Sequence, residues 1–365
     1  MNNSPLVYDL SIEQLEKAIS DFGESRYRAF QIWEGIYKNY WSESDKFTNL
    51  PKNLRINLNS SFTFSHLNPK TILESKDKQT HKTLFQLPDM NTVETVMMGY
   101  ENRKTICISS QAGCAMGCVF CATGQIGFKR NLSSGEIIEQ VLYYARRLHE
   151  DNKNITNIVI MGMGEPFHNY EATIEAIKRL NQPNGMHFGY RRFTISTVGI
   201  IPGIKLFIKE KIQVNLAISL HAANDELRSS LIPINKKYPL EDLLGICLDY
   251  VNQSGRRISF EWALIDGIND SIQDAVQLVN LLKPFLKNGN RLCHVNLIPL
   301  NPTKRFQGSP SLSTNSEKFR LELEKHKIPC SIRMRRGIDI QAGCGQLAGD
   351  QVGKFNLEIE KNGNE

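Results

Sequence analysis

Short apolar runs alternate with amphipathic segments from about residue 100 to residue 345. The runs have the β-branched and aromatic content of strands, and they span residues 105–110, 157–163, 192–197, 214–221, 258–265 and 293–300. The segments between them carry apolar residues at the three-to-four spacing of helices, and they span residues 133–150, 170–181, 201–210, 238–253 and 271–287. Strands that alternate with helices predict an α/β fold with a parallel sheet, and six repeats favour a partial (β/α)6 barrel of the TIM type.

The first 90 residues have a different pattern. Ser11 is placed to cap a helix, and residues 27–40 form a second helical segment whose aromatic side chains we interpret mainly as core. Residues 80–87 and 92–100 alternate as strands do. We therefore expect a small helical accessory domain with a linker over 1–90, a barrel domain over 91–350 and a polar tail over 351–365.

Composition narrows the class of protein. The chain has 365 residues, 41% of them hydrophobic and 22% charged, which is typical of a globular protein rather than a disordered one. No apolar run approaches the roughly 20 residues of a membrane span, and the start lacks the basic and apolar stretches of a secretion signal. We expect a cytoplasmic protein without membrane association, whose eight cysteines stay reduced. The net charge of +6 permits a nucleic-acid partner without indicating one.

Three cysteines stand close together after the first predicted barrel strand. Cys114, Cys118 and Cys121 form a C-x3-C-x2-C pattern, with small residues between them. A zinc site usually takes a fourth ligand and different spacing, and no histidine nearby supplies one. Chance packing of three buried thiols is a further alternative. An iron–sulfur cluster with three protein ligands would leave one iron open to another molecule.

Small and polar residues end several of the other predicted strands. Glycines in MGMGEP (161–166) would allow a ligand to approach the backbone, or would simply form a tight turn. Ser196, the 219–221 stretch and Asn301 are, taken one at a time, typical caps or turn residues. Because the carboxyl ends of parallel strands share one rim of a barrel, we expect these residues to lie together.

The cysteine pattern, with Phe120 directly before its last cysteine, resembles the radical S-adenosylmethionine superfamily. That resemblance implies one 4Fe–4S cluster per chain on the three cysteines, and S-adenosylmethionine on the open iron. The cofactor supplies the radical chemistry, and the protein supplies placement and exclusion of water. Carried over residue by residue, the resemblance assigns cofactor binding to seven positions: Gly164, Glu165, Ser196, Ser219, Leu220, His221 and Asn301.

A narrower resemblance rests on six strings. They are ICISSQAGC (106–114), GFKRNL (127–132), MGMGEP (161–166), ISTVGIIP (195–202), SLHAAND (219–225) and GIDIQAGCGQL (337–347). Together they resemble the RlmN/Cfr family of RNA methyltransferases over about residues 90–350, and the helical N-terminal unit fits that family's accessory domain. The resemblance implies two molecules of S-adenosylmethionine per turnover.

In that family the cysteine matching Cys344 receives a methyl group from the first cofactor molecule. A radical made from the second removes a hydrogen from this group, and the methylene adds to an adenine carbon that polar methyl transfer cannot reach. The cysteine matching Cys107 then forms a transient disulfide with Cys344 and releases the RNA, while the residue matching Glu94 accepts a proton. From the residues alone, Cys344 could be an inert surface thiol, Cys107 a packed strand cysteine and Glu94 a solvent-facing strand residue.

The resemblance also implies substrates and partners. We favour methylation at C2 of adenine 2503 in 23S rRNA and of adenine 37 in tRNAs, with the C8-adenine branch that confers antibiotic resistance as the alternative. A non-enzymatic zinc protein that binds RNA is a third hypothesis. We expect a flavodoxin-type electron donor and a monomer. Basic residues that could bind RNA are Lys129–Arg130, Arg191–Arg192, Arg256–Arg257, Arg333, Arg335 and Arg336. Three cysteines are left as packing residues: Cys247, Cys293 and Cys330.

Overall fold

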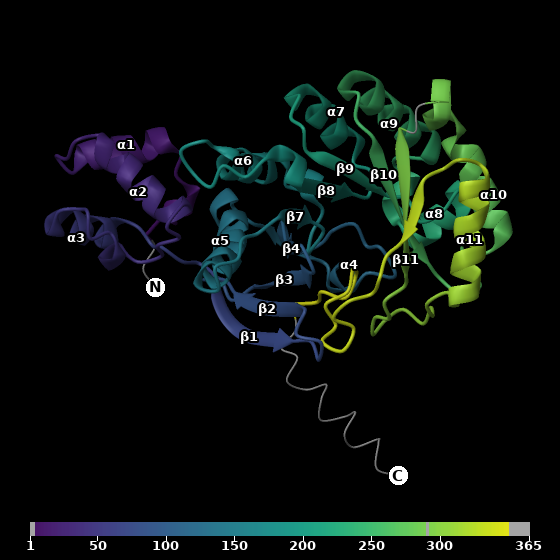
Figure 1. The fold of residues 1–365 in the computed structure, drawn as a ribbon, viewed down its shortest axis with the longest axis horizontal. Coiled ribbons are helices and arrows are strands. Elements are labelled where there is room, and N and C mark those ends of the chain that lie inside the picture. The colour runs from purple at the N-terminus through teal and green to yellow at the C-terminus, as the bar shows by residue number, and fades with distance from the viewer. Residues whose placement is uncertain (1–3, 290–291, 350–365) are drawn as a thin grey trace, which may run out of the picture.

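The computed structural model describes residues 4–289 and 292–349. Its main sheet has ten strands in the order β1-β2-β3-β4-β7-β8-β9-β10-β11-β12 (Figure 1). Six neighbouring strands are parallel: β4 (Arg103–Ile108), β7 (Asn157–Ile160), β8 (Phe193–Thr197), β9 (Asn215–Ser219), β10 (Ile258–Leu264) and β11 (Cys293–Pro299). The short strand β12 (Cys330–Ile332) adds in parallel to β11. The predicted partial α/β barrel is confirmed.

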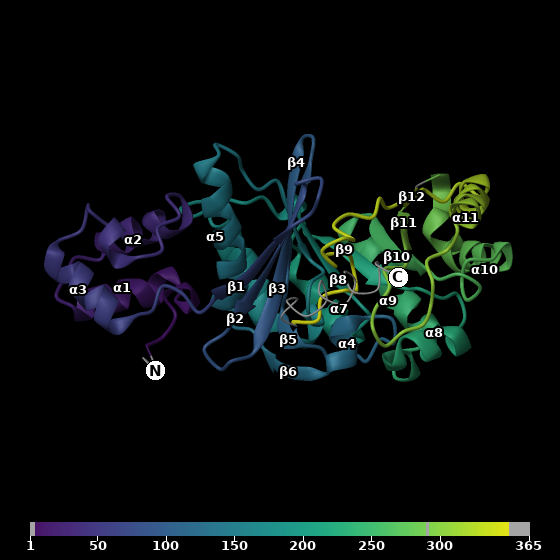
Figure 2. The same cartoon turned by 90° about the horizontal axis from the view of Figure 1, so that it is seen from below.

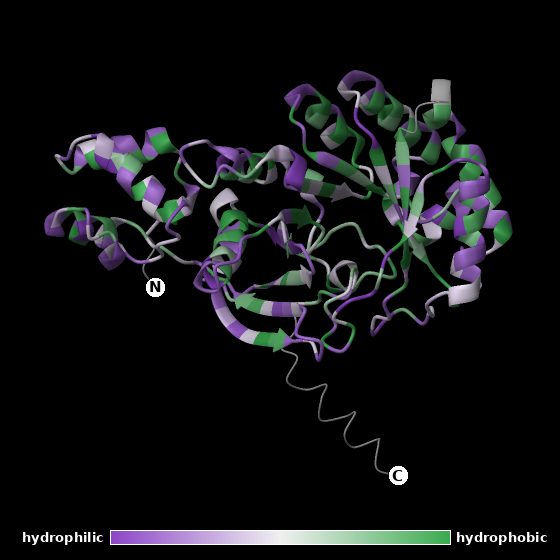
Figure 3. Ribbon diagram, viewed as in Figure 1, coloured by the Kyte–Doolittle hydropathy of each residue, from purple (hydrophilic) through white to green (hydrophobic). Residues whose placement is uncertain are grey.

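Helices connect successive parallel strands and cover the outside of the barrel (Figures 1 and 2). They are α5 (Ser134–Glu150), α6 (Tyr170–Asn181), α7 (Ile201–Glu210), α8 (Asp225–Leu231), α9 (Leu240–Ser254), α10 (Ile272–Leu282) and α11 (Ser313–Lys325). Ser133 starts α5 with a capping box, in which Glu136 bonds back to the Ser133 backbone. Hydrophobic residues predominate in the parallel strands of the barrel, whereas β1, β2 and the surrounding helices carry both hydrophobic and hydrophilic residues (Figure 3). Within the described residues, no helix is both long and apolar enough to cross a membrane.

Three antiparallel strands extend the sheet beyond the barrel. They are β1 (Asn68–Glu74), β2 (Thr80–Gln86) and β3 (Thr92–Tyr100), and β3 pairs with β4. Within the accessory domain with linker predicted over 1–90, helices extend to residue 61, and the strands expected near its end pair with the main sheet along the whole of β2 and β3. The predicted tail 351–365 lies outside the described residues.

The helical unit comprises α1 (Ile12–Asp21), α2 (Tyr27–Tyr37) and α3 (Lys52–Ser61). It lies at one end of the molecule, next to the barrel helices α5 and α6 (Figures 1 and 2). On α2, Trp33 and Tyr37 are buried, whereas Tyr27 and Phe30 are exposed. The aromatic stripe is therefore only half core.

Short elements complete the chain. Next to the barrel, β5 (Gln111–Gly113) pairs with β6 (Phe128–Asn131), and α4 (Ala122–Ile126) lies between them in sequence. Single 3-10 turns span Val7–Asp9, Ser44–Lys46, Pro166–His168, Tyr190–Arg192, Pro233–Lys236 and Lys283–Gly289. After β12 the chain crosses to the antiparallel hairpin, where Asp339 accepts a hydrogen bond from the Lys76 backbone at 2.8 Å. This crossing brings the C-terminal segment over the open side of the sheet.

Candidate active site

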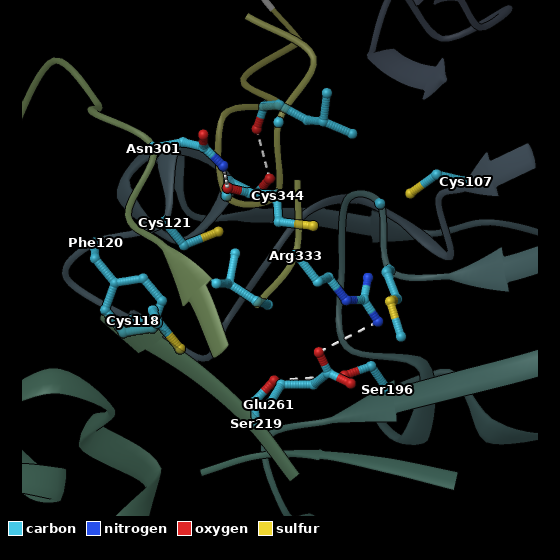
Figure 4. Close-up of a pocket in the computed structure, with 18 of the residues that line it drawn as sticks. Cys107, Cys118, Phe120, Cys121, Ser196, Ser219, Glu261, Asn301, Arg333 and Cys344 are labelled. Atoms are coloured by element: carbon cyan, nitrogen blue, oxygen red, sulfur yellow. Dashed lines mark hydrogen bonds and ion pairs between the residues drawn. The ribbon is translucent and has the colours of Figure 1, made fainter. Parts of the chain in front are cut away.

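A cavity of about 230 Å³ opens at the carboxyl ends of the parallel strands (Figure 4). Eleven of the thirteen residues singled out from the sequence line it: Cys107, Cys114, Cys118, Cys121, Gly164, Glu165, Ser196, Ser219, His221, Asn301 and Cys344. Glu94 and Leu220 are not on its wall. Residues separated by more than 200 positions thus meet in one space, as the shared rim of the strands predicts.

The three clustered cysteines lie on the loop between β5 and α4. Gly113 opens this loop with a φ of +72°, and a side chain there would collide with the backbone carbonyl of Gly127. Burial raises the pKa of Cys114 to about 12 and that of Cys118 well above its usual value. Without a bound cation these thiols keep their protons, so metal binding would have to deprotonate them.

The arrangement of these thiols favours a cluster over zinc. Zinc requires its sulfur ligands about 2.3 Å from a single point. Nowhere in residues 4–289 and 292–349 are three His, Cys, Asp or Glu side chains grouped to hold one metal ion. A cubane cluster instead spreads its cysteine ligands over several irons. Two buried thiols and the half-buried thiol of Cys121 around one cavity, none of them in a disulfide, fit that requirement.

The Gly164–Glu165 turn links the ends of two strands. Gly164 has a φ of +101°, and a Cβ there would lie 2.5 Å from the Gln111 side chain. The buried carboxylate of Glu165 accepts hydrogen bonds from the backbone of Phe167 at 3.0 Å and of Val198 at 2.9 Å. Burial raises its pKa to about 7. The turn therefore presents bare backbone and a titratable acid to the cavity.

The ends of β8 and β9 contribute two hydroxyls and an imidazole. The Oγ atoms of Ser196 and Ser219 are 3.4 Å apart. His221 accepts a hydrogen bond at Nδ1 from the backbone of Ala263 at 2.8 Å, and burial, assisted by Arg228, lowers its pKa to about 3. The ring is therefore neutral, and its proton is on Nε2 as a hydrogen-bond donor.

Arg228 holds this rim together from behind. Its buried guanidinium donates to the backbone carbonyls of Val198, Ser219 and Leu220 at 2.7–3.1 Å. Leu220 itself is fully buried, and both its N–H and its C=O are bonded within the protein. The structure thus makes Leu220 part of the support of the rim, away from the cavity surface.

Cys344 stands on the loop after β12 and is exposed to solvent on the cavity side. Asn301 donates to its carbonyl at 3.1 Å, and the backbone of Ala122, next to Cys121, donates to the carbonyl of Gly345 at 2.7 Å. Desolvation of the thiol by the surrounding cavity wall raises the pKa of Cys344, while the charge of Arg333 opposes that shift. The Cys344 loop is therefore bonded directly to the loop of the three clustered cysteines.

Cys107 reaches the same cavity from β4 (Figure 4). Its side chain is buried, and this burial raises its pKa to about 12, with Arg333 again acting in the opposite direction. Both Cys107 and Cys344 are free thiols. The cavity therefore holds five cysteines from three separate parts of the chain.

Glu261 is a candidate functional residue that the sequence pattern did not identify. Glu261 on β10 is buried on the cavity wall, where it lies 3.4 Å from Arg333 and accepts a hydrogen bond from Asn296 at 2.8 Å. The sequence does place this acidic residue inside the apolar strand ISFEWALI. A buried carboxylate needs a partner, so its position there could have indicated a functional site.

Glu94 is buried, 1% exposed, so the interpretation of a solvent-facing strand residue is wrong. The C-terminal segment covers this face of the sheet and removes it from water. Glu94 pairs with Lys82 at 3.0 Å.

The predicted basic pairs are less available for binding RNA than the sequence pattern indicated. Arg130 pairs with Asp89 and Glu136 within the protein. Arg191–Arg192 and Arg256–Arg257 precede β8 and β10, at the end of the barrel opposite the cavity. Arg333, Arg335 and Arg336 do line the cavity.

Comparisons with known proteins agree with this geometry. Residues 108–279 match the model of the radical SAM superfamily, and residues 7–63 match the N-terminal domain of a ribosomal RNA large subunit methyltransferase. The chain is 42% identical to "Dual-specificity RNA methyltransferase RlmN 1" of Myxococcus xanthus, over 95% of each chain. A crystal structure of a radical SAM methyltransferase from Sphaerobacter thermophilus superposes with a TM-score of 0.91 at 46% identity, covering 95% of this chain and all of that one.

Proposed function

Because this chain belongs to the RlmN family of radical SAM RNA methyltransferases, we propose that it methylates C2 of adenine 2503 in 23S rRNA and of adenine 37 in tRNAs. Family membership implies a 4Fe–4S cluster and S-adenosylmethionine. The observation that carries the proposal is the meeting of five cysteines in one cavity, three on one loop and two on separate elements. A protein that only cleaved the cofactor would need the three alone.

Cys114, Cys118 and Cys121 would hold the cluster, and Gly164, Glu165, Ser196, Ser219, His221 and Asn301 would hold S-adenosylmethionine. Together the two groups supply a methyl group and a carbon radical. Gly164 lets the cofactor approach the backbone, and the ionised form of Glu165 favours an ammonium group. The neutral His221 would donate a hydrogen bond from Nε2 without adding a positive charge to the cavity.

Cys344 carries the methyl group as a thioether. Its position beside the loop of the clustered cysteines brings that group close to the place where the radical forms. Loss of one hydrogen atom would leave a methylene radical that bonds to the adenine carbon, and the adduct would then give up the proton of that carbon and one electron, which the cluster can take back. Cys107 would attack the sulfur of Cys344, so that a disulfide forms and the sulfur–carbon bond breaks. The electron pair of that bond takes up a proton to complete the methyl group, and the methylated base leaves. Two molecules of S-adenosylmethionine are used in each turnover.

Glu94 is the proposed acceptor of the proton from the adenine carbon. Both of its carboxylate oxygens are already bonded, one to Lys82 and the other to the backbone of Ala348 and Gly349. Proton acceptance would therefore require the second oxygen to exchange its N–H donors for the substrate. Because those donors belong to the segment after Cys344, this segment would have to move after the methylene adds to the base and before the product is released.

RNA would reach the cavity past Tyr100, Met334 and Arg335. The Met334 side chain is 75% exposed, and the exposed Arg335 has no partner among residues 4–289 and 292–349. The guanidinium groups of Arg103 and Arg336 lie over the Tyr100 ring. The Met334 thioether therefore offers the flexible surface to unstacked bases, and the free guanidinium of Arg335 suits a phosphate. We further propose a monomer that works in the cytoplasm, takes one cluster per chain and receives electrons from a flavodoxin-type donor.

The test is methylation of RNA by the protein purified and reconstituted without oxygen. We expect an iron- and sulfide-containing protein that yields 2-methyladenosine in digests of both 23S rRNA and tRNA, measured by mass spectrometry. 8-Methyladenosine instead would assign the protein to the C8 branch. A colourless protein that binds zinc and no sulfide would refute the radical mechanism.

A further inference from the structure

Lys82 is a buried lysine on β2, outside the cavity and outside every motif discussed above. Its side chain is 3% exposed, and its ammonium lies 3.0 Å from one oxygen of Glu94. The same ammonium donates to the backbone carbonyl of Gln341 at 3.1 Å. Removing a lysine from water is costly, and apolar residues of similar size often stabilise a core equally well. The pair therefore calls for a reason other than stability.

The second oxygen of Glu94 points to that reason. It accepts hydrogen bonds from the backbone of Ala348 at 2.8 Å and of Gly349 at 3.1 Å. The Lys82–Glu94 pair thus holds the chain three residues before Cys344, at Gln341, and again four and five residues after it. One buried ion pair grips both arms of the loop that carries Cys344.

The tip of this loop is fixed by different groups. Asn301 holds the carbonyl of Cys344 itself, and the backbone of Ala122 holds that of Gly345. The tip is thereby bonded to the barrel, while the arms are bonded to the antiparallel strands β2 and β3. The place of the Cys344 sulfur depends on both sets of bonds.

We infer that Lys82 is a positioning residue for Cys344: the Lys82–Glu94 pair clamps both arms of the loop and so fixes the sulfur between the clustered cysteines and Cys107. This inference rests on the proposed function, which makes Cys344 the methyl carrier. A methionine at position 82 would fill the same volume but would release Gln341 and leave the Glu94 carboxylate buried without its cation. The arms of the loop would then loosen while the cluster loop stayed in place.

The experiment compares Lys82→Met, Lys82→Arg and the unaltered full chain, each reconstituted with its cluster. Cleaved cofactor and methylated RNA are counted in the same reaction. We expect Lys82→Met to cleave S-adenosylmethionine within about twofold of the unaltered rate, while methylated RNA per cofactor cleaved falls roughly 10- to 100-fold, as expected for a misplaced reacting group. Lys82→Arg, which keeps the charge and the donors, should recover most of the yield.

Arg179→Met is the matched control. Arg179 is also a buried cation, 3% exposed, that bonds a backbone carbonyl, that of Tyr8, and a carboxylate, that of Glu175. It lies at the joint with the helical unit, so its loss should lower the melting temperature without changing methylated RNA per cofactor cleaved. An unchanged ratio in Lys82→Met, or an equal fall in both variants, would overturn the inference.

A second measurement keeps the two proposals apart. In the protein without cofactor, the rate at which iodoacetamide alkylates Cys344 reports the freedom of the loop, whatever the protein does to RNA. We expect Lys82→Met to raise this rate about tenfold and Arg179→Met to leave it unchanged. If the unaltered protein methylates no RNA, the proposed function fails, but the alkylation rates still decide the clamp. If Lys82→Met does not fold, Lys82→Gln, which keeps a donor for Gln341, serves in both assays, with a smaller change of the same sign expected.

Discussion

The carboxylate of Glu165 accepts a hydrogen bond from the backbone N–H of Val198 at 2.9 Å, so a buried acid joins the ends of β7 and β8. Burial raises the pKa of Glu165 from 4.5 to about 7. The folded protein therefore holds a proton that the unfolded chain would lose between these two values. Its contribution to stability is complete below pH 4.5 and is lost as the pH rises through about 7.

The same titration predicts how cofactor binding responds to pH. The ammonium of S-adenosylmethionine favours the ionised carboxylate, so affinity should weaken up to about tenfold for each pH unit below 7. Calorimetry in buffers of different ionisation enthalpy should detect a proton released on binding near pH 6. In Glu165→Gln both the pH dependence and the proton release should disappear; their persistence would remove Glu165 from the cofactor site.

Gly164→Ala should abolish cofactor binding. The φ of +101° disfavours any side chain, and the added Cβ would meet the Gln111 side chain at 2.5 and 2.7 Å. We expect at least a 100-fold loss of affinity for S-adenosylmethionine, measured by equilibrium dialysis, because the turn must shift. Gly255→Ala is the control, since Gly255 also has a positive φ, +65°, but open space around it. That variant should lose only about 1 kcal/mol of stability and no affinity.

Cys107→Ala should trap RNA on the protein. Without the second thiol nothing attacks the sulfur of Cys344, so the adduct persists and a slow band appears on denaturing gels. Cys344→Ala should form no adduct and transfer no methyl group, while its iron and sulfide content stays unchanged. Cys330→Ala, a half-buried cysteine away from the cavity, should behave as the unaltered protein does. A slow band in Cys344→Ala would contradict the assignment of the carrier.

Arg228→Met should lower both stability and cofactor affinity. It removes one donor from each of three backbone carbonyls at the ends of β8 and β9, of which that of Leu220 keeps the Ala222 N–H. We expect a cost of roughly 2–4 kcal/mol. Thermal unfolding and dialysis measure the two effects. Arg256→Met removes an arginine that bonds Asn215 at the opposite end of β9, and it should leave the affinity unchanged. Equal loss of affinity in both variants would argue against a local role for Arg228.

The exposed aromatic face of α2 is expected to bind RNA. Tyr27 and Phe30 are 52% and 43% exposed, one helical turn apart. Replacing both by alanine should weaken binding of a tRNA about tenfold or more in filter-binding assays, because each stacked base is worth about 1–3 kcal/mol. Cofactor cleavage should not change. Leu312→Ala, which removes a 62% exposed apolar side chain on the barrel domain, is the control, and a similar loss there would point to a nonspecific effect.

The local pattern of apolar and polar residues predicted the barrel and most of the residues at the carboxyl ends of its strands. The strand that ends at Ser219 and the loop of Cys114 carry their own sequence signals, and the rule for parallel strands brings them together. The state of Glu94 could not be predicted in this way. What buries it lies 254 and 255 residues further along the chain, and no pattern within a strand reports a cover so distant.

The same limit affected the basic residues and the strand that begins at Asn68. Arg130 belongs to a chain of ion pairs with Asp89 and Glu136, and only the fold brings these residues together. The strand from Asn68 joins the sheet through pairing with β2, which alternation along one strand does not reveal. Contacts between residues far apart in the sequence thus account for most of the differences between the predicted and the observed structure.

The two halves of the proposed chemistry rest on different parts of one sheet. The parallel strands and the loop of three cysteines would form a radical source, whereas the arms of the Cys344 loop are anchored to the antiparallel strands β2 and β3. A barrel without this extension would hold the proposed methyl carrier only by the tip of its loop, through Asn301 and Ala122. The three antiparallel strands at the sheet margin would thus allow a source of radicals to deliver a methyl carbon from a cysteine held at a fixed place.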